Sequence, residues 1–144
     1  MAIISKTAKD MMLGDDAVSA MYRFINDNSK AIGVDGRRVF KYERPQKLGI
    51  GEYLVINSLP FMRRNAIEEG VVNVNIHVPR TLSNEPNTKR LKSIAKGLLS
   101  FFKDATYLDG SYFEFYCDSR PTPDNDNTYY INLKFNVTYN NLKN

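Results

Sequence analysis

The sequence predicts an α+β fold, in which two helices pack on an antiparallel (mixed) β-sheet and residues 1–144 form a single domain. The predicted elements follow the order helix, three strands, helix, two strands, so strands come in runs instead of alternating with helices. Residues 71–80 carry the clearest strand pattern, and residues 87–105 carry the clearest helix pattern. Nine tyrosines and eight phenylalanines, without a tryptophan, favour a core rich in sheet.

Residues 1–14 show no clear period and are expected to form a flexible segment. Helical spacing first appears in residues 15–33. Asp15 or Asp16 can cap this helix by accepting a hydrogen bond from a free backbone N–H, and Gly33 can end it. The apolar positions at helical spacing are Val18, Met21, Tyr22 and Ile25.

Two strands are predicted next, in the stretches RRVFKYERPQ and GEYLVINSLPF. Pro45, Gly49 and Gly51 mark their connection, and Pro60 ends the second strand because proline removes a backbone donor. Neither strand has a clearly two-faced pattern. Residues 37–64 are therefore expected to form an extended arm that a neighbouring molecule covers, and MRRNAIEEG an exposed loop or short turn.

Residues 71–80, VVNVNIHVPR, alternate between apolar and polar side chains until Pro79 closes the strand. This period predicts a strand with one face on the core and the other face in water or on a partner. The core face would hold Val72, Val74, Ile76 and Val78, and the wet face Asn73, Asn75 and His77.

The second helix is predicted over residues 87–105 from an uninterrupted apolar stripe, which contains Leu91, Ile94, Ala95, Leu98, Leu99 and Phe102. Two strands follow. The stretch SYFEFYCDS places Phe113, Phe115 and Cys117 on one face, and TYYINLKFNVTYNN places Tyr129, Ile131, Leu133, Phe135, Val137 and Tyr139 on one face. The polar linker between them, RPTPDNDN, is long for a tight turn and is expected to project as a loop.

The residues with catalytic or metal-binding chemistry form no recognisable motif. His77, the only histidine, has no nucleophile or carboxylate at a suggestive spacing. The single cysteine, Cys117, occupies a core-facing position and excludes an intrachain disulfide. A calcium loop starting at Asp124 would need glycine and glutamate where the chain has Tyr129 and Phe135. The prediction is therefore no catalytic residue, no cofactor and no metal.

Charge is distributed unevenly along a chain whose net charge is +4. Residues 37–47 and the second helix are rich in lysine and arginine, whereas residues 104–126 carry six carboxylates against Arg120. A solvated surface explains this pattern, and so does head-to-tail association of like subunits. No apolar run reaches the roughly 18 residues that cross a bilayer, and no signal-peptide pattern is present, so a soluble protein of a reducing cytoplasm is expected.

Residues 15–140 resemble the tail-terminator, or tail-completion, proteins of long-tailed bacteriophages. The resemblance rests on the first helix, on RVFKYERPQ and EYLVINSLPF as an extended pair, on VVNVNIHVP just before the helix TKRLKSIAKGLLSFF, and on the final pair that ends in YYINLKFNVTYN. It is a likeness of layout, without a catalytic signature.

The resemblance implies a structural virion protein of the phage neck. Such a protein forms a ring, typically a hexamer, on the head-proximal end of the tail tube and presents a docking surface to the head connector. DNA passes through the ring without specific binding, and assembly takes place in the cytoplasm of the host bacterium. Candidate subunit-interface residues are Arg37, Arg38, Lys41, Arg44, Tyr53, Val55, Arg63, Arg64, Lys89, Arg90, Asp118, Asp124 and Asp126.

Three alternatives remain open at the level of the sequence. One is a head-closure or connector protein of the same neck. Another is a small nucleic-acid-binding domain that uses the basic segments 37–47 and 89–103. The third is a small hydrolase that uses His77 with Asp118 or Cys117.

Overall fold

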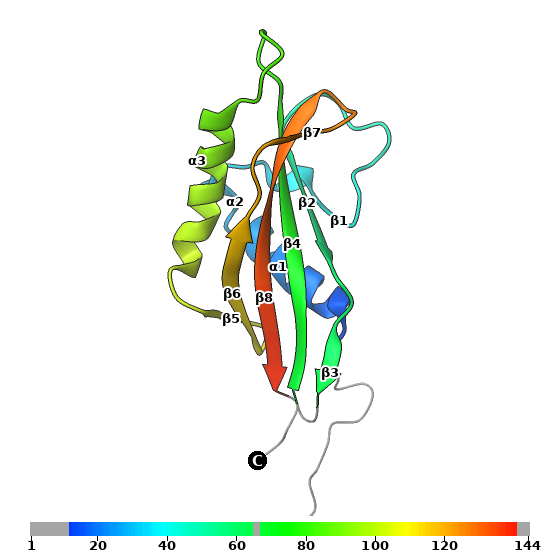
Figure 1. Cartoon of the computed structure of the whole chain (residues 1–144), viewed down its shortest axis with the longest axis vertical. Coiled ribbons are helices and arrows are strands. Elements are labelled where there is room, and N and C mark those ends of the chain that lie inside the picture. The colour runs from blue at the N-terminus through cyan, green and yellow to red at the C-terminus, as the bar shows by residue number, and fades with distance from the viewer. Residues whose placement is uncertain (1–11, 65–66, 141–144) are drawn as a thin grey trace, which may run out of the picture.

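A mixed eight-stranded sheet, with its helices on one face, organises the chain in the computed structural model, which describes residues 12–64 and 67–140. Figure 1 views the sheet from its open side, with α1 (Gly14–Asp27) crossing behind it and α3 (Thr88–Leu99) along one flank. The α+β class with two helices packed on the sheet is thus confirmed.

The first predicted helix is divided in two. It consists of α1 and the short α2 (Ser29–Ile32), which are separated at Asn28. Asp16 caps α1 from inside the first turn, where its carboxylate accepts a hydrogen bond from the Leu13 N–H at 2.8 Å. Gly33 ends α2 with a left-handed backbone, φ 93°, as its sequence position predicts.

The main path of the sheet runs in the order β1-β2-β4-β8-β6-β5, and β3 and β7 pair with β4 and β8 beyond the ends of the shorter strands. Every pair is antiparallel except β1 and β2, which are parallel. The strands are β1 Val39–Lys41, β2 Tyr53–Ser58, β3 Met62–Arg64, β4 Ile67–Pro79, β5 Thr106–Leu108, β6 Ser111–Asp118, β7 Thr122–Pro123 and β8 Thr128–Asn140.

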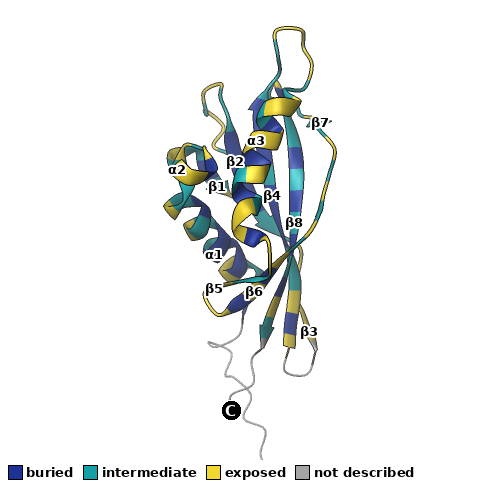
Figure 2. Cartoon of the chain, turned by 90° about the vertical axis from the view of Figure 1, so that its left-hand side faces the viewer, coloured by how far each residue is buried: buried dark blue, intermediate teal, exposed yellow. Residues whose placement is uncertain are grey.

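The core lies between the helices and the covered face of the sheet. Val74, at the centre of β4, stands opposite Ile56 on one side and Leu133 on the other, and all three are buried. Figure 2 shows the matching buried stripe along α3. Its buried residues are Leu91, Ile94, Ala95 and Leu98, as predicted, and Phe102 extends the stripe beyond the helix.

Three predictions about the connections were wrong. Residues 37–64 form no separate arm, because β2 lies inside the sheet between β1 and β4 and buries residues 53–56. The segment MRRNAIEEG was expected to be a loop or short turn, but its described residues belong to strands, since they form β3 and the start of β4. The linker before β8 contains β7, which pairs with β8 at Tyr130 and Tyr129.

The expected flexible segment 1–14 lies mostly outside the described residues. Its described end is tied to the body: Met12 is buried, and its N–H donates to the carboxylate of buried Glu68 at 2.8 Å. Among the residues that the structure describes, no helix has the length and apolar character needed to cross a membrane.

Candidate functional site

The open face of the sheet is built from three rows of side chains that run across β2, β4 and β8. Partner residues of antiparallel strands share a face, so the strand register defines each row. The rows are Tyr53–His77–Tyr130, Val55–Asn75–Asn132 and Asn57–Asn73–Lys134. The opposite side of the same strands carries the apolar core. The alternation in residues 71–80 was therefore interpreted correctly as one core face and one polar face.

Side-chain amides form a network in the middle of this open face. Asn132 donates to the amide oxygens of Asn75 at 2.8 Å and Asn73 at 3.2 Å. Asn73 donates to Asn57 at 2.9 Å, and the Lys134 ammonium donates to Asn73 at 2.9 Å. The network lines a shallow hollow of about 340 Å³, whose wall is completed by Ser119, Thr122 and Tyr130.

His77 lies at one end of the open face and is buried, with 6% of its surface exposed. The expectation of a wet histidine was wrong. Its ring is stacked between Tyr53, at 4.3 Å between centroids, and Tyr130, at 5.0 Å. The turn between β7 and β8 brings Asp124 and Thr128 against its Nδ1 atom. The sequence pattern around His77 could not predict that it is covered, because Asp124 and Thr128 are about fifty positions away in the chain.

A continuous chain of hydrogen bonds joins this histidine to β2. The Thr128 hydroxyl donates to Asp126 at 2.5 Å, so its oxygen accepts from His77 Nδ1 at 3.1 Å. Asp126 also accepts from the Tyr53 hydroxyl and pairs with the Arg44 guanidinium at 3.2 Å. The arrangement holds the β7–β8 turn on β2 and β4, and it is called the histidine clip below.

A metal ion would find His77, Asp124 and Asp126 here, because their donor atoms lie within 4.8 Å of one another. Both oxygens of Asp126 already accept hydrogen bonds, however, and Arg44 balances its charge. Nδ1 of His77 is engaged with Thr128. The cluster is thus explained by contacts within the chain as a structural clip.

The clip shifts the proton affinities of its members. Burial lowers the pKa of His77, although the Asp126 and Asp124 carboxylates oppose this effect. Burial also raises the pKa of Tyr53, and the hydrogen bond to Asp126 raises it further. For Asp126, burial would raise the pKa, but the hydrogen bonds from Thr128 and Tyr53 outweigh it, so the pKa is lowered. At neutral pH the clip therefore contains a neutral imidazole and an ionised Asp126.

The partners required by the hydrolase alternative are not brought to His77. β6 places Cys117 opposite Lys134 and Asp118 opposite Leu133, whereas His77 stands opposite Tyr130. Lys134 and Tyr130 are four residues apart along β8, or about 13 Å. The carboxylates that do reach the imidazole are Asp124 and Asp126.

Several arginines proposed for the subunit interface act within the chain. Arg38 donates to the carbonyl oxygens of Glu52 at 2.7 Å and Gly49 at 2.6 Å. Arg90 forms a two-pronged pair with Glu52, at 2.6 and 2.8 Å, which raises the pKa of Arg90. Arg38 and Arg90, together with Arg44 of the histidine clip, therefore stabilise the fold of their own chain. The sequence analysis had proposed all three for the subunit interface.

The other charged candidates have different surroundings. Arg37 is exposed and pairs with Asp35 at 3.2 Å, and Arg63 pairs with Glu68 at 3.5 Å. Arg64 lies opposite Ile67 at the end of β3. Lys41, Lys89 and Asp118 are exposed. Asp124 and Asp126 belong to the clip. Tyr53 and Val55, which were candidates for the subunit interface, are buried within the chain.

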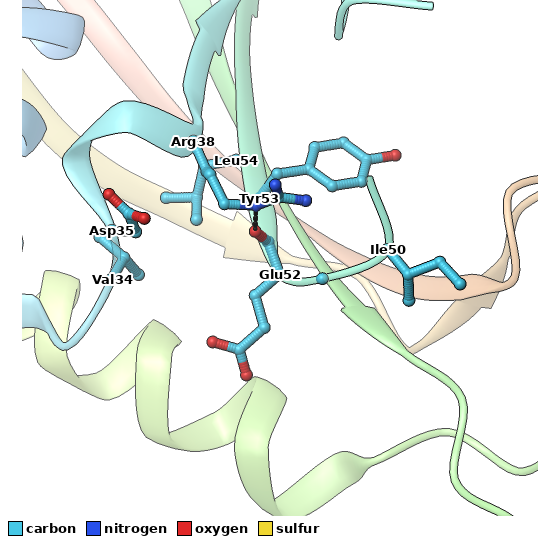
Figure 3. A pocket seen from close by; sticks show the side chains of 8 residues that line it. Val34, Asp35, Arg38, Ile50, Glu52, Tyr53 and Leu54 are labelled. Carbon is cyan, nitrogen blue, oxygen red and sulfur yellow. Dashed lines mark hydrogen bonds between the residues drawn. The ribbon is translucent and has the colours of Figure 1, made fainter. Parts of the chain in front are cut away.

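The β1–β2 connection encloses a hollow of about 230 Å³ against the turn before β1, shown in Figure 3. Arg38 reaches across its wall to the Glu52 carbonyl, while the Glu52 side chain points away toward α3. Ile50, at the rim, is 89% exposed. Arg38 donates to backbone carbonyls, the Glu52 carboxylate pairs with Arg90, and Asp35 pairs with Arg37. These polar groups therefore have structural partners, and the hollow offers no assembled reactive group.

The sequence analysis missed three exposed tyrosines near the other edge of the sheet. Tyr107, Tyr112 and Tyr116 are 67%, 39% and 62% exposed. The rings of Tyr107 and Tyr112 meet edge to face, with centroids 4.3 Å apart. The available signal was the alternation in β6, which places Tyr112 on the other face of the sheet from the core-facing Phe113.

Comparison with known proteins supports the fold and leaves the family open. No family model matches the chain, and no curated protein matches it. Eleven chains of solved structures do match. One of them, whose name states no function, has a TM-score of 0.56 and 13% identity, over 93% of this chain and 98% of the other. At that identity the likeness establishes a shared fold.

Proposed function

We propose that this chain is a structural protein of the neck of a long-tailed phage: a tail terminator that forms a ring, most simply a hexamer, on the head-proximal end of the tail tube. Its partners are further copies of itself, the tail-tube protein and the head connector. DNA passes through the ring, and no reaction or cofactor is involved. The protein is assembled in the host cytoplasm and ends up in the virion. The proposal starts from the resemblance of residues 15–140 to this family.

The observation that carries the proposal is the two-sided sheet. Helices cover one face, and the other face is open and lined mainly by neutral amides. A ring that lets DNA through needs a wall that water wets but that does not hold phosphates through salt-sensitive contacts. Lys134, the cation lining the hollow, is engaged by Asn73. The open face meets this requirement, and we assign it to the channel.

The nucleic-acid-binding alternative has weaker support. Sequence-independent binding of DNA needs cations that are free to contact phosphate. Arg38, Arg44 and Arg90 are engaged with carbonyl and carboxylate oxygens of the same chain, so the cations of these segments that are free for phosphate are mainly exposed lysines, such as Lys41, Lys47 and Lys89. A head-closure protein of the same neck is the alternative within the leading class, and it differs from a terminator in its position in the particle.

Electron microscopy of tails tests the proposal. The purified chain is mixed with tubes of the tail-tube protein encoded by a neighbouring gene, and a fusion label marks the chain. A labelled ring at one end of the tube, together with tubes that stop growing, is the expected result. Labelled rings that attach to head connectors and never to tubes would favour head closure. A chain that binds neither would overturn both assignments.

A further inference from the structure

We propose that copies of this chain join head to tail through opposite edges of the sheet, with the β5–β6 edge of one copy seated in a hollow beside β1 of the next. The inference rests on the proposed function of a ring protein and identifies the two surfaces that would meet. The strand order puts β1 and β5 at the two ends of the sheet's main path. α1 packs against both β1 and β5, and no hydrogen bond or ion pair among the described residues joins the two surfaces directly.

The first surface, called the acidic edge, combines exposed tyrosines with unpaired carboxylates. Its aromatic part is Tyr107, Tyr112 and Tyr116. Glu114 and Asp118 of β6 are exposed, and neither has a hydrogen bond or an ion pair within residues 12–64 and 67–140. Tyrosine is favoured at protein interfaces because it buries a large ring with little loss of side-chain freedom. Exposed aromatic area bordered by charge is typical of a contact surface.

The second surface, called the basic hollow, is an open depression of about 660 Å³ along β1, and it lies between that strand, α1 and the β1–β2 connection. Two half-buried rings, Tyr22 and Phe40, form part of its wall. The Lys41 ammonium lies 5.9 Å from the centre of the Tyr22 ring, and its hydrogen-bond partner among the described residues is the neutral hydroxyl of Ser19, at 3.3 Å. Glu43 is the one carboxylate among the residues that line the hollow, and it is exposed. Lys47, in the same connection, is exposed and has no ion pair among the described residues.

The two surfaces complement each other in charge and in shape. One presents exposed carboxylates and protruding rings. The other presents the Lys41 ammonium at a depression with aromatic walls, and Lys47 beside it, against one carboxylate, Glu43, so its exposed charge is positive by one. The residues already neutralised within the chain, Arg37 by Asp35 and Asp109 by Arg23, border these surfaces but add little net charge. Two different complementary patches on one subunit produce a heterologous contact, which closes into a ring when the rotation per subunit allows.

The contact should be individually weak. Exposed ion pairs contribute little and are screened by salt, so most of the attraction must come from the tyrosines. A ring gains from closure, because the last contact forms within one assembly. We therefore expect little association at low protein concentration and rings at high concentration or on a tube.

Charge exchange between the edges provides the test. One variant combines Glu114→Lys with Asp118→Lys, and the other combines Lys41→Glu with Lys47→Glu. Each alone presents like charges at every contact and should weaken association, measured by sedimentation at low salt, at least tenfold. Mixed in equal amounts, the two variants restore opposite charges at every contact in an alternating ring. Lys92→Glu with Lys96→Glu, on the exposed side of α3, is the matched control and should leave association unchanged.

Cross-linking covers the case in which solution association is too weak to measure. Lys41→Cys and Tyr112→Cys are placed together in a Cys117→Ser background, and a short bismaleimide is added to concentrated protein. A ladder that ends in a closed ring is expected, and the pair Lys92→Cys with Tyr112→Cys should give none. Equal ladders from both pairs, or no rescue on mixing the charge variants, would overturn the inference.

The outcomes separate this inference from the proposed function. Rings on tube ends that are indifferent to all these substitutions would leave the function standing and remove the edge contact. Edge-dependent ladders from a chain that never associates with tubes or connectors would keep the contact and remove the function.

Discussion

At the scale of single residues, the histidine clip holds the β7–β8 turn over one end of the open face. His77 is packed between two tyrosine rings, and its Nδ1 atom is tied through Thr128 to Asp126. A histidine without catalytic partners thus has a structural role. It fastens the β7–β8 turn over the strands that carry the amide network.

Replacing His77 by alanine should destabilise the fold by about 1–3 kcal/mol, through the loss of a buried hydrogen bond and of ring packing. His77→Phe keeps the ring and should cost less. Urea denaturation of both variants measures the difference. A cost below about 0.5 kcal/mol for His77→Ala would return the residue to the surface role that its sequence position suggested.

Acidification should weaken the clip. Burial lowers the pKa of His77 in the folded chain, so the unfolded chain, whose histidine titrates near 6.5, takes up the proton first. The contribution of His77 to stability is complete above that pH and declines as pH falls toward the lowered folded pKa. The stability advantage of the wild type over His77→Phe should therefore shrink from pH 7.5 to 5. An advantage that grew on acidification would mean that Asp124 and Asp126 outweigh burial.

At the scale of elements, the segments with regular periodicity could be predicted from the sequence, whereas the short strands β5 and β7 could not. The stripe of α3 and the alternation of β4 reflect one core, so each could be located from its own residues. β5 and β7 contain three and two residues, and they exist only through pairing with β6 and β8. The parallel pairing of β1 with β2, and the cover over His77, depend on distant partners. No local pattern encodes them.

Helix packing gives a prediction that opposes helix propensity. Gly97 lies inside α3, where alanine would normally stabilise a helix by about 1 kcal/mol. A Cβ atom at this position would lie 2.6 Å from the carbonyl oxygen of Ile32. Because that oxygen belongs to the backbone of α2, the helices must separate, at a cost of about 1–3 kcal/mol. Gly97→Ala should therefore lower the thermal midpoint, whereas exposed Ser93→Ala should leave it unchanged or raise it slightly.

At the scale of the whole molecule, the fold separates three surfaces. Helices and core occupy one side of the sheet, and the amide network with Lys134 lines the other. At the edges, Glu114 and Asp118 are exposed on β6, and Lys41 and Glu43 are exposed at β1. In the proposed ring, the edges join the subunits and the amide face borders the channel. The charged side chains that would attract neighbouring subunits then lie away from the path of the DNA.

This division predicts the effect of a single added charge. Asn132→Lys places an ammonium group where an amide donates to Asn75 and Asn73, so the new side chain can keep a donor at the same position. If the open face borders the channel, assembled rings of this variant should bind DNA more tightly. Each lysine that contacts a phosphate should steepen the dependence of log affinity on log salt by about 0.9. Ser93→Lys adds the same charge on the exposed side of α3 and should leave both quantities unchanged. DNA binding by rings across a salt series measures the two variants side by side. Equal gains from both lysines would mean that the DNA meets no particular face, and a gain from Ser93→Lys alone would place the helices on the channel.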